Sequence, residues 1–205
     1  MAWTAQGGER LLTETEPGGL AHRGHPLKQY LFFDLDGTVT DSQTGIIRSV
    51  QHALAHFGLV RSDESLLPFI GPPLKDSFGK VFPDDPAKAD LAVQKYREYY
   101  ADTGIFENAL YAGIADLLAD LRREGRTVTL ATSKPEPFAL RILDHFGIAA
   151  CFDHVAGAEL KGPRNSKTAV LQYACDLCGV TDFERCLMVG DRKYDVLGAH
   201  AHRYF

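Results

Sequence analysis

The chain has 205 residues, 45% of them apolar and 24% charged, and its formal net charge is −5. These values fit one globular domain with room for an insertion, and they exclude collagen-like and wholly disordered chains. The acidic balance leaves no broad basic surface for a nucleic-acid backbone, so no nucleic-acid partner is expected. No apolar run approaches the roughly 20 residues that cross a bilayer. The first 20 residues lack the features of a secretory signal, so we expect a cytoplasmic protein with no membrane partner.

The N-terminal half of the chain contains one strand pattern and several helical patterns. Residues 1–28 show no sustained hydrophobic period and are expected to form a loose extension. Residues 30–33, Tyr-Leu-Phe-Phe, form a continuous apolar run that predicts a strand buried on both faces. Apolar residues recur at helical spacing from 46 to 57, and Gly58 predicts the end of that helix. The segment 61–108 shows only helical patterns and turns marked by proline or glycine.

Strand and helix patterns alternate in the second half of the chain. We predict strands at 127–131, 154–156 and 186–189, and helices over 114–121, 138–146 and 170–177. This alternation predicts an α/β fold with a parallel sheet and helices on both of its faces. In such sheets, chemistry gathers at the carboxyl ends of the strands.

Polar side chains cluster at the predicted carboxyl ends of these strands. In chain order they are Asp34, Asp36, Thr132, Ser133, Asp191 and Asp195, and Lys167 opens the helix that leads into the fourth strand. Four carboxylates in one place repel one another unless a cation lies among them. Because the possible metal ligands among these side chains are oxygen atoms, a hard metal ion is expected. Mg²⁺ takes one or two carboxylates together with substrate phosphate, which matches this set.

The Asp-x-Asp spacing after the first strand also predicts the orientation of the two carboxylates. Alternate residues of an extended chain point the same way, so Asp34 and Asp36 are expected to face one substrate while Leu35 turns into the core. One carboxylate can attack phosphorus and form an aspartyl-phosphate. The second can protonate the leaving oxygen and later deprotonate water. Gly37 allows the backbone to turn tightly out of the strand.

Four segments of the chain together resemble a known family. FFDLDGTVTDS, LATSKP, SKTAVLQYA and MVGDRKYD are similar, in content and order, to the four motifs of the haloacid dehalogenase-like hydrolases, over about residues 29–201. PFIGPPL followed by GDRKYDVLGA is most similar to members known as phosphoglycolate phosphatases or 5′-nucleotidases. The resemblance implies a Rossmann-like, doubly wound core over residues 29–40 and 109–205, with a helical cap inserted over 41–108. Residues 1–28 belong to neither.

The resemblance implies roles for the acidic residues. Asp34 is expected to be the nucleophile and a Mg²⁺ ligand. Asp36 is expected to be the general acid/base, with its backbone carbonyl also on Mg²⁺. Asp191 is expected to be the acidic metal ligand, and Asp195 to support the metal directly or through water.

The resemblance also implies a reaction. Thr132 and Ser133 are expected to bind phosphate, and Lys167 to stabilise its charge. The implied activity is a Mg²⁺-dependent phosphatase that acts on a small phosphorylated metabolite, similar to phosphoglycolate or a nucleoside monophosphate, as a monomer or weak homodimer. Two alternatives stay open. One is a sugar phosphomutase, and the other is a non-catalytic remnant that binds a phosphorylated ligand or partner.

Several of these residues have simpler interpretations. Asp36 precedes a glycine and could merely form a turn. Asp195 could be an acid favoured by a helix N-terminus. Lys161 competes with Lys167, which is preferred because it begins a periodic helix. Lys134 is expected to be a structural or rim residue.

Polar side chains in the predicted cap have two interpretations each. His52 and His56 lie four residues apart, a spacing that can bind metal, but a solvated helix face is favoured. Arg48 and Lys75 are candidates for contacts with the substrate from the cap side.

Aromatic residues and thiols are assigned to packing. Tyr96, Tyr99 and Tyr100 could stack a nucleobase, but a packed cap helix is favoured. Cys175 and Cys178 form a C-x-x-C within a predicted helix. Without a matching second pair, buried or half-buried thiols are favoured over zinc or redox chemistry.

The C-terminal sequence departs from the family pattern. The chain ends at GAHAHRYF, where related proteins usually continue with a helix, a fifth strand and a terminal helix. The expected fold therefore lacks its C-terminal strand. The fourth strand is expected beside the first, with an unpaired apolar edge.

Overall fold

The parallel sheet predicted from the alternating patterns forms the centre of the molecule. The computed structural model describes residues 27–202, so the predicted extension over residues 1–28 lies almost wholly outside the described part. The strand order is β5-β4-β1-β6, and all three pairs are parallel. The strands are β1 (Tyr30–Phe33), β4 (Thr127–Pro135), β5 (His154–Ala158) and β6 (Cys186–Val189). The predicted α/β fold class is confirmed.

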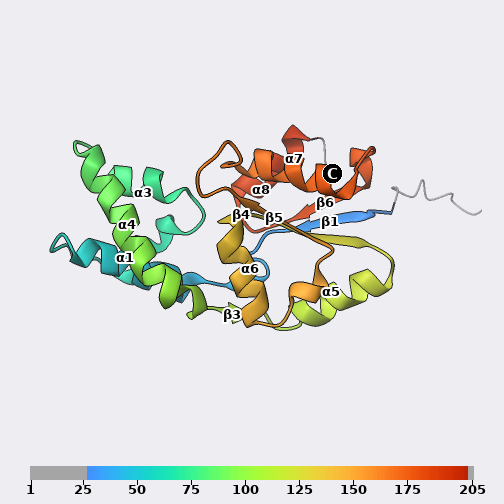
Figure 1. Ribbon diagram of the computed structural model, residues 1–205, viewed down its shortest axis with the longest axis horizontal. Helices are drawn as coiled ribbons and strands as arrows, with labels where there is room; N and C mark the ends of the chain where they lie inside the picture. Colours follow the sequence, from blue (N-terminus) through green and yellow to red (C-terminus); the bar gives the residue numbers. More distant parts are fainter. Residues whose placement is uncertain (1–26, 203–205) are drawn as a thin grey trace, which may run out of the picture.

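The two faces of the sheet carry two separate apolar cores. Four helices cover them: α5 (Ile114–Arg123), α6 (Glu136–His145), α7 (Lys167–Cys178) and α8 (Lys193–Ala201). Leu31 and Phe33 of β1 enter the core formed with α5 and α6, whereas Phe32 enters the core formed with α7 and α8. Figure 1 shows these two helix layers on opposite sides of the sheet. Burial on both faces explains why β1 reads as a continuous apolar run.

A group of helices lies at the end of the sheet toward which the strands run (Figure 1). We call them the cap helices: α1 (Gln43–Ala55), α2 (Asp63–Leu66), α3 (Leu74–Val81) and α4 (Pro86–Asp102), with the short 3-10 turns η1 (Leu67–Phe69) and η2 (Gly104–Phe106). Their apolar side chains join the core on the α5 and α6 side. No helix within residues 27–202 is long and apolar enough to span a membrane.

A short ladder that the sequence did not predict connects the cap helices to the sheet. β2 (Thr40–Asp41) pairs in antiparallel fashion with β3 (Ala109–Leu110). Two residues are too few for the alternation of apolar and polar side chains that marks a strand. The ladder holds side by side the two segments by which the chain leaves the sheet and returns to it.

β6 forms one edge of the sheet. It pairs with β1, as expected for the fourth strand, and it has no second neighbour among residues 27–202. Leu187, Met188 and Val189 are half-buried there.

Candidate active site

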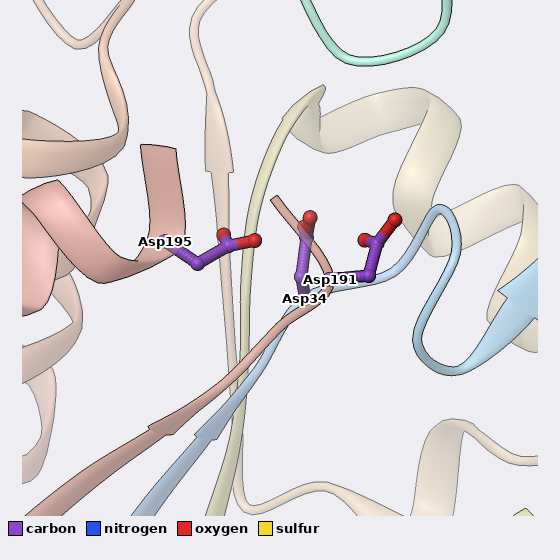
Figure 2. Close-up of side chains that lie close together, drawn as sticks. All are labelled: Asp34, Asp191 and Asp195. Carbon is purple, nitrogen blue, oxygen red and sulfur yellow. The ribbon is translucent and has the colours of Figure 1, made fainter. Parts of the chain in front are cut away.

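Three carboxylates meet where β1 and β6 end. Asp34 directly follows β1, Asp191 lies just beyond β6, and Asp195 lies in the first turn of α8. One oxygen atom from each lies within 4.8 Å of the others, and the side chains converge from the ends of β1 and β6 and from the start of α8 (Figure 2). The N–H of Asp34 donates to the carbonyl of Val189 at 2.9 Å, which extends the β1–β6 ladder into the site. The structure thus brings together three of the predicted acids.

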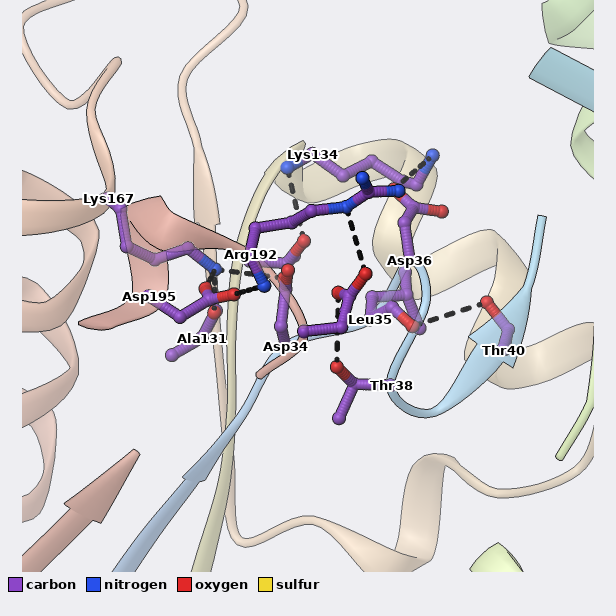
Figure 3. Close-up of polar contacts among 12 residues, drawn as sticks. Asp34, Leu35, Asp36, Thr38, Thr40, Ala131, Lys134, Lys167, Arg192 and Asp195 are labelled. Carbon is purple, nitrogen blue, oxygen red and sulfur yellow. Dashed lines mark hydrogen bonds and ion pairs between the residues drawn. The ribbon is translucent and has the colours of Figure 1, made fainter. Parts of the chain in front are cut away.

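Lys167 supplies positive charge within this cluster (Figure 3). Its Nζ lies 2.9 Å from Asp34 Oδ1 and 2.8 Å from Asp195 Oδ1, and it donates to the carbonyl of Ala131 at 2.9 Å. The Lys167 side chain is 4% exposed, whereas Lys161 is an exposed residue. Of the two competing lysines, the structure brings Lys167 to the carboxylates.

The charge balance of the cluster favours a bound cation. Burial raises the pKa of Asp34 above its ordinary value. The charge of Lys167 opposes this rise, and the charge of Asp195 adds to it. Asp34 and Asp195 share one buried lysine, Asp191 pairs with Arg192 instead, and the three acids offer only carboxylate oxygens as metal ligands. Asp34, Asp191 and Asp195 therefore fit a hard divalent cation.

Asp195 lies both at a helix N-terminus and in the carboxylate cluster, so both interpretations of this residue apply. Its Oδ2 accepts a hydrogen bond at 2.9 Å from the N–H of Arg192, the N-cap residue of α8, while its Oδ1 faces Lys167. It therefore stabilises the helix terminus and also belongs to the cluster. Asp191 is more exposed, and it pairs with Arg192 Nε at 2.8 Å and accepts from the hydroxyl of Thr38 at 3.5 Å.

The turn after β1 is organised around the carbonyl of Leu35. This carbonyl accepts hydrogen bonds from the N–H groups of Val39 and Thr40, both at 2.9 Å. It also accepts from the Thr40 hydroxyl at 3.5 Å (Figure 3). The Leu35 side chain is fully buried, as the alternation predicted. Gly37 has a φ of +87°, and a Cβ at this position would lie 2.5 Å from Asp191 Oδ2. Glycine is therefore required both for the turn and for clearance of the Asp191 carboxylate.

Asp36 is paired with Lys134, which was expected to be a structural or rim residue. Lys134 Nζ lies 3.0 Å from Asp36 Oδ2, and the Lys134 side chain is only 7% exposed. Of the two expectations for Lys134, a structural or a rim residue, this buried ion pair supports the structural one. The lysine lies there because β4 continues through Pro135, with a register shift between Thr132 and Pro135 that was not predicted. In the sequence, the only indication of this contact was the position of Lys134 two residues after Thr132.

Thr132 and Ser133 follow the paired part of β4. Leu130 lies opposite Phe33 in the ladder, so Thr132 lies close to the end of β1. Thr132 is 1% exposed, and its hydroxyl accepts from the N–H of Lys134 at 3.1 Å, whereas Ser133 is exposed. Their role as phosphate ligands stays a prediction.

The two basic candidates on the cap helices have partners within the cap region. Arg48 pairs with Glu107, and Lys75 Nζ lies 3.0 Å from Asp90. Both basic side chains are exposed, and the structure engages them with these acids rather than with the carboxylate cluster.

The aromatic residues of α4 pack mainly as predicted. Tyr96 and Tyr100 are buried, and their rings stack at 5.4 Å. Tyr99 is half-buried, and its ring lies 5.4 Å from that of His52. His52 and His56 are exposed on α1, which agrees with a solvated face.

The C-x-x-C lies in α7, and both of its cysteines are thiols, as expected. Cys175 is buried and Cys178 is half-buried. Cys178 Sγ lies 3.2 Å from the hydroxyl of Thr129 in β4. This contact accounts for the position of Cys178 as packing between helix and sheet.

Known proteins share this arrangement. Residues 31–203 match the family model described as haloacid dehalogenase-like hydrolase. A 5′-nucleotidase of Pseudomonas aeruginosa is 45% identical over 170 residues, which cover 82% of this chain and 76% of that protein. A phosphoglycolate phosphatase of Haemophilus influenzae is 32% identical over 183 residues, which cover 82% and 80% of the two chains.

This chain is also similar to the solved structure of a protein named as a kinase. Protein tyrosine kinase A of Mycobacterium tuberculosis superposes with a TM-score of 0.75 and 43% identity, over 86% of this chain and 81% of that chain. The present chain spans 59% of the length of the full kinase sequence. The family model, the relatives and the fold agree with the resemblance found in the sequence. The chain belongs to the haloacid dehalogenase-like hydrolase family, among its phosphatases.

Proposed function

We propose that the protein is a Mg²⁺-dependent phosphatase that hydrolyses a small phosphomonoester through an aspartyl-phosphate on Asp34. The observation that carries the proposal is the position of Asp34: a buried carboxylate at a strand end, 2.9 Å from Lys167 Nζ and within reach of two further acids. A buried carboxylate paired in this way is available to attack phosphorus, because it is fixed in place and shielded from bulk water.

The metal would be held by carboxylate oxygens of Asp34, Asp191 and Asp195, with the backbone carbonyl of Asp36 as a further ligand. When bound, Mg²⁺ neutralises negative charge on the phosphoryl oxygens. The donor set supports this assignment because it consists of hard oxygen atoms and carries more negative charge than Lys167 can offset.

Each step of the proposed reaction is assigned to a residue of the chain. Asp34 attacks phosphorus, the bond between phosphorus and the leaving oxygen breaks, and Asp36 gives that oxygen a proton. Asp36, now a carboxylate, takes a proton from water, whose oxygen attacks phosphorus, and phosphate leaves with Asp34 restored. Thr132 and Ser133 hold phosphoryl oxygens in this scheme, and Lys167 offsets their charge.

The names of two relatives support the substrate class that we propose. A 5′-nucleotidase and a phosphoglycolate phosphatase both release phosphate from small phosphomonoesters, and we extend this class to the present chain. We further propose that the protein works in the cytoplasm, as a monomer or weak homodimer, without a nucleic-acid partner.

The test is release of inorganic phosphate from p-nitrophenyl phosphate and from a panel of phosphorylated metabolites, with and without Mg²⁺. We expect release that needs Mg²⁺ and stops with a chelator. Isomerisation of β-glucose 1-phosphate without net phosphate release would instead support a phosphomutase. Thermal stabilisation by phosphorylated ligands without any release would support a non-catalytic binding protein.

Replacing Gly37 by alanine should damage the metal site more than the fold. The added Cβ would collide with the Asp191 carboxylate, so we expect activity at low Mg²⁺ to fall about 100-fold, as for other misplacements on the order of 1 Å. Gly58→Ala is the matched control, because Gly58 also has a positive φ, of 69°, but has open space around its Cβ position. Phosphate release as a function of Mg²⁺ concentration is the measurement. Equal activity in the two variants would show that Asp191 need not stay in place.

A further inference from the structure

Lys134 connects the proposed acid/base to the cap. Its Nζ lies 3.0 Å from Asp36 Oδ2 and donates to the hydroxyl of Tyr100 at 2.5 Å. The same ammonium group lies 4.7 Å from the centre of the Tyr100 ring. Tyr100 belongs to α4, so one lysine, whose side chain is only 7% exposed, touches both the turn after β1 and a cap helix.

The backbone of Lys134 is also fixed. Its N–H donates to the Thr132 hydroxyl at 3.1 Å, next to the register shift in β4. The lysine is therefore held at its backbone by the predicted phosphate-binding loop and at its end by Asp36 and Tyr100. A side chain so constrained has little freedom to swing toward another partner.

The two oxygens of Asp36 have different surroundings. Oδ2 faces the Lys134 ammonium group, whereas Oδ1 is buried and has no hydrogen-bond partner among residues 27–202. An ion pair through one oxygen fixes the orientation of the carboxyl group and leaves the other oxygen available. A carboxyl group held in one orientation can exchange a proton with a leaving group at a defined position.

We propose that Lys134 is a positioning residue for Asp36, and that Tyr100 ties this positioning to the seating of cap helix α4. The inference rests on the proposed function, because it assigns Lys134 a task only if Asp36 is the acid/base. It differs from the role of Lys167, which contacts Asp34 and Asp195 rather than Asp36. Neither Lys134 nor Tyr100 needs to touch the substrate.

Positioning of an acid has a kinetic consequence that depends on the leaving group. An alkoxide leaves poorly unless it is protonated, whereas p-nitrophenolate leaves readily without a proton. Loss of Lys134 should therefore slow reactions of alkyl phosphates and largely spare p-nitrophenyl phosphate. A residue that bound phosphate or merely held the fold together would affect both substrates alike.

The experiment compares kcat/KM for p-nitrophenyl phosphate and for an alkyl phosphate in the full chain with Mg²⁺. This constant covers only the steps up to departure of the first leaving group, so later hydrolysis of the phosphoenzyme does not enter it. For Lys134→Met we expect a loss of about 100-fold with the alkyl phosphate, at the lower end of what general acids contribute, and a change below about threefold with p-nitrophenyl phosphate. For Tyr100→Phe we expect a smaller loss, about fivefold to tenfold, with the same selectivity.

Matched variants control for the loss of a lysine or a hydroxyl group on the cap. Tyr99→Phe removes a neighbouring hydroxyl that contacts Glu107, and Lys95→Met removes a lysine paired with Glu98 on the same helix. Both controls should leave the ratio between the two substrates unchanged. Lys134→Arg should recover part of the lost selectivity, because an arginine also carries a charge to Asp36.

The variant Asp36→Asn distinguishes a failure of the inference about Lys134 from a failure of the proposed function. If Asp36→Asn loses activity selectively with the alkyl phosphate and Lys134→Met does not, the inference about Lys134 is overturned while the proposed function stands. If Asp36→Asn shows no selectivity, the acid/base assignment in the proposed function is itself wrong. If Lys134→Met does not fold, Tyr100→Phe decides, and an equal effect on both substrates in that variant overturns the inference.

Discussion

Asp34→Asn is expected to lose at least about 10⁴-fold in phosphatase activity while keeping its fold. The variant removes the carboxylate oxygen that would bond to phosphorus, and no other described carboxylate takes the same place beside Lys167 at the end of β1. Lys167 keeps Asp195 as a partner at 2.8 Å, so the buried lysine does not become unpaired. Steady-state phosphate release, together with a circular dichroism spectrum, is the measurement.

The same substitution should stabilise the protein when metal is absent. The pKa of Asp34 is raised by burial, so its ionised form is disfavoured in the folded state. The stability associated with this group is present below its ordinary pKa of about 3.8 and is lost as pH rises through the raised value. Asparagine imitates the neutral form. In a chelator, the melting temperature of Asp34→Asn should therefore exceed that of the wild type at pH 7, and the difference should shrink toward pH 4.

Asp116→Asn is the control for this pair of measurements, because Asp116 is an exposed acid in the first turn of α5. It should change neither activity nor the pH dependence of melting appreciably. Wild-type activity in Asp34→Asn would remove the nucleophile assignment. If the difference in melting temperature between Asp34→Asn and the wild type did not vary with pH, burial would not disfavour the ionised form of Asp34.

Lys167→Met should lose both activity and stability. The variant leaves Asp34 and Asp195 buried without their shared cation, and it leaves the Ala131 carbonyl without its donor. Removing one partner of a buried ion pair costs about 3–5 kcal/mol, so we expect the free energy of unfolding to fall by about this amount without metal. Activity should fall about 10³-fold, the upper range for loss of one group that stabilises charge in a transition state.

Urea unfolding with and without Mg²⁺ checks the stability part of this prediction. Mg²⁺ should restore some of the lost stability, because it supplies positive charge to the same carboxylates. Lys161→Met serves as the matched control, since Lys161 is exposed in the loop that precedes α7. If Lys167→Met and Lys161→Met unfold at the same urea concentration, the ion pairs of Lys167 contribute nothing to the fold.

The sequence predicted the parts of the fold that depend on local pattern. β1 and β6 have the predicted bounds, because each is a continuous apolar run that ends directly before Asp34 or Gly190. The residues after these strands could be assigned to one edge because parallel strands end together. This reasoning alone brought Asp34 and Asp191 to one site, and the periodicity of α7 correctly favoured Lys167 over Lys161.

The features that the sequence did not reveal depend on contacts between distant segments. β2 and β3 are too short to produce a period, and only their pairing defines them as strands. Lys134 reads as an ordinary lysine after a strand, and its partner Tyr100 reads as an ordinary core tyrosine of α4. Their contact joins residues 34 positions apart, and it arises only because the cap helices fold back over the carboxyl ends of the strands. No local pattern encodes that placement.

The central claim, that Asp34 carries the phosphoryl group, is tested most directly by trapping the intermediate. Asp36→Asn should still accept a phosphoryl group from p-nitrophenyl phosphate, which needs no acid, but should hydrolyse it slowly because the base is missing. After rapid quenching with acid in the presence of Mg²⁺, mass spectrometry should find one phosphoryl group on the peptide that contains Asp34, and hydroxylamine should remove it. A burst of p-nitrophenol with the phosphoryl group on a different residue, or turnover with no labelled protein at any time, would contradict the account.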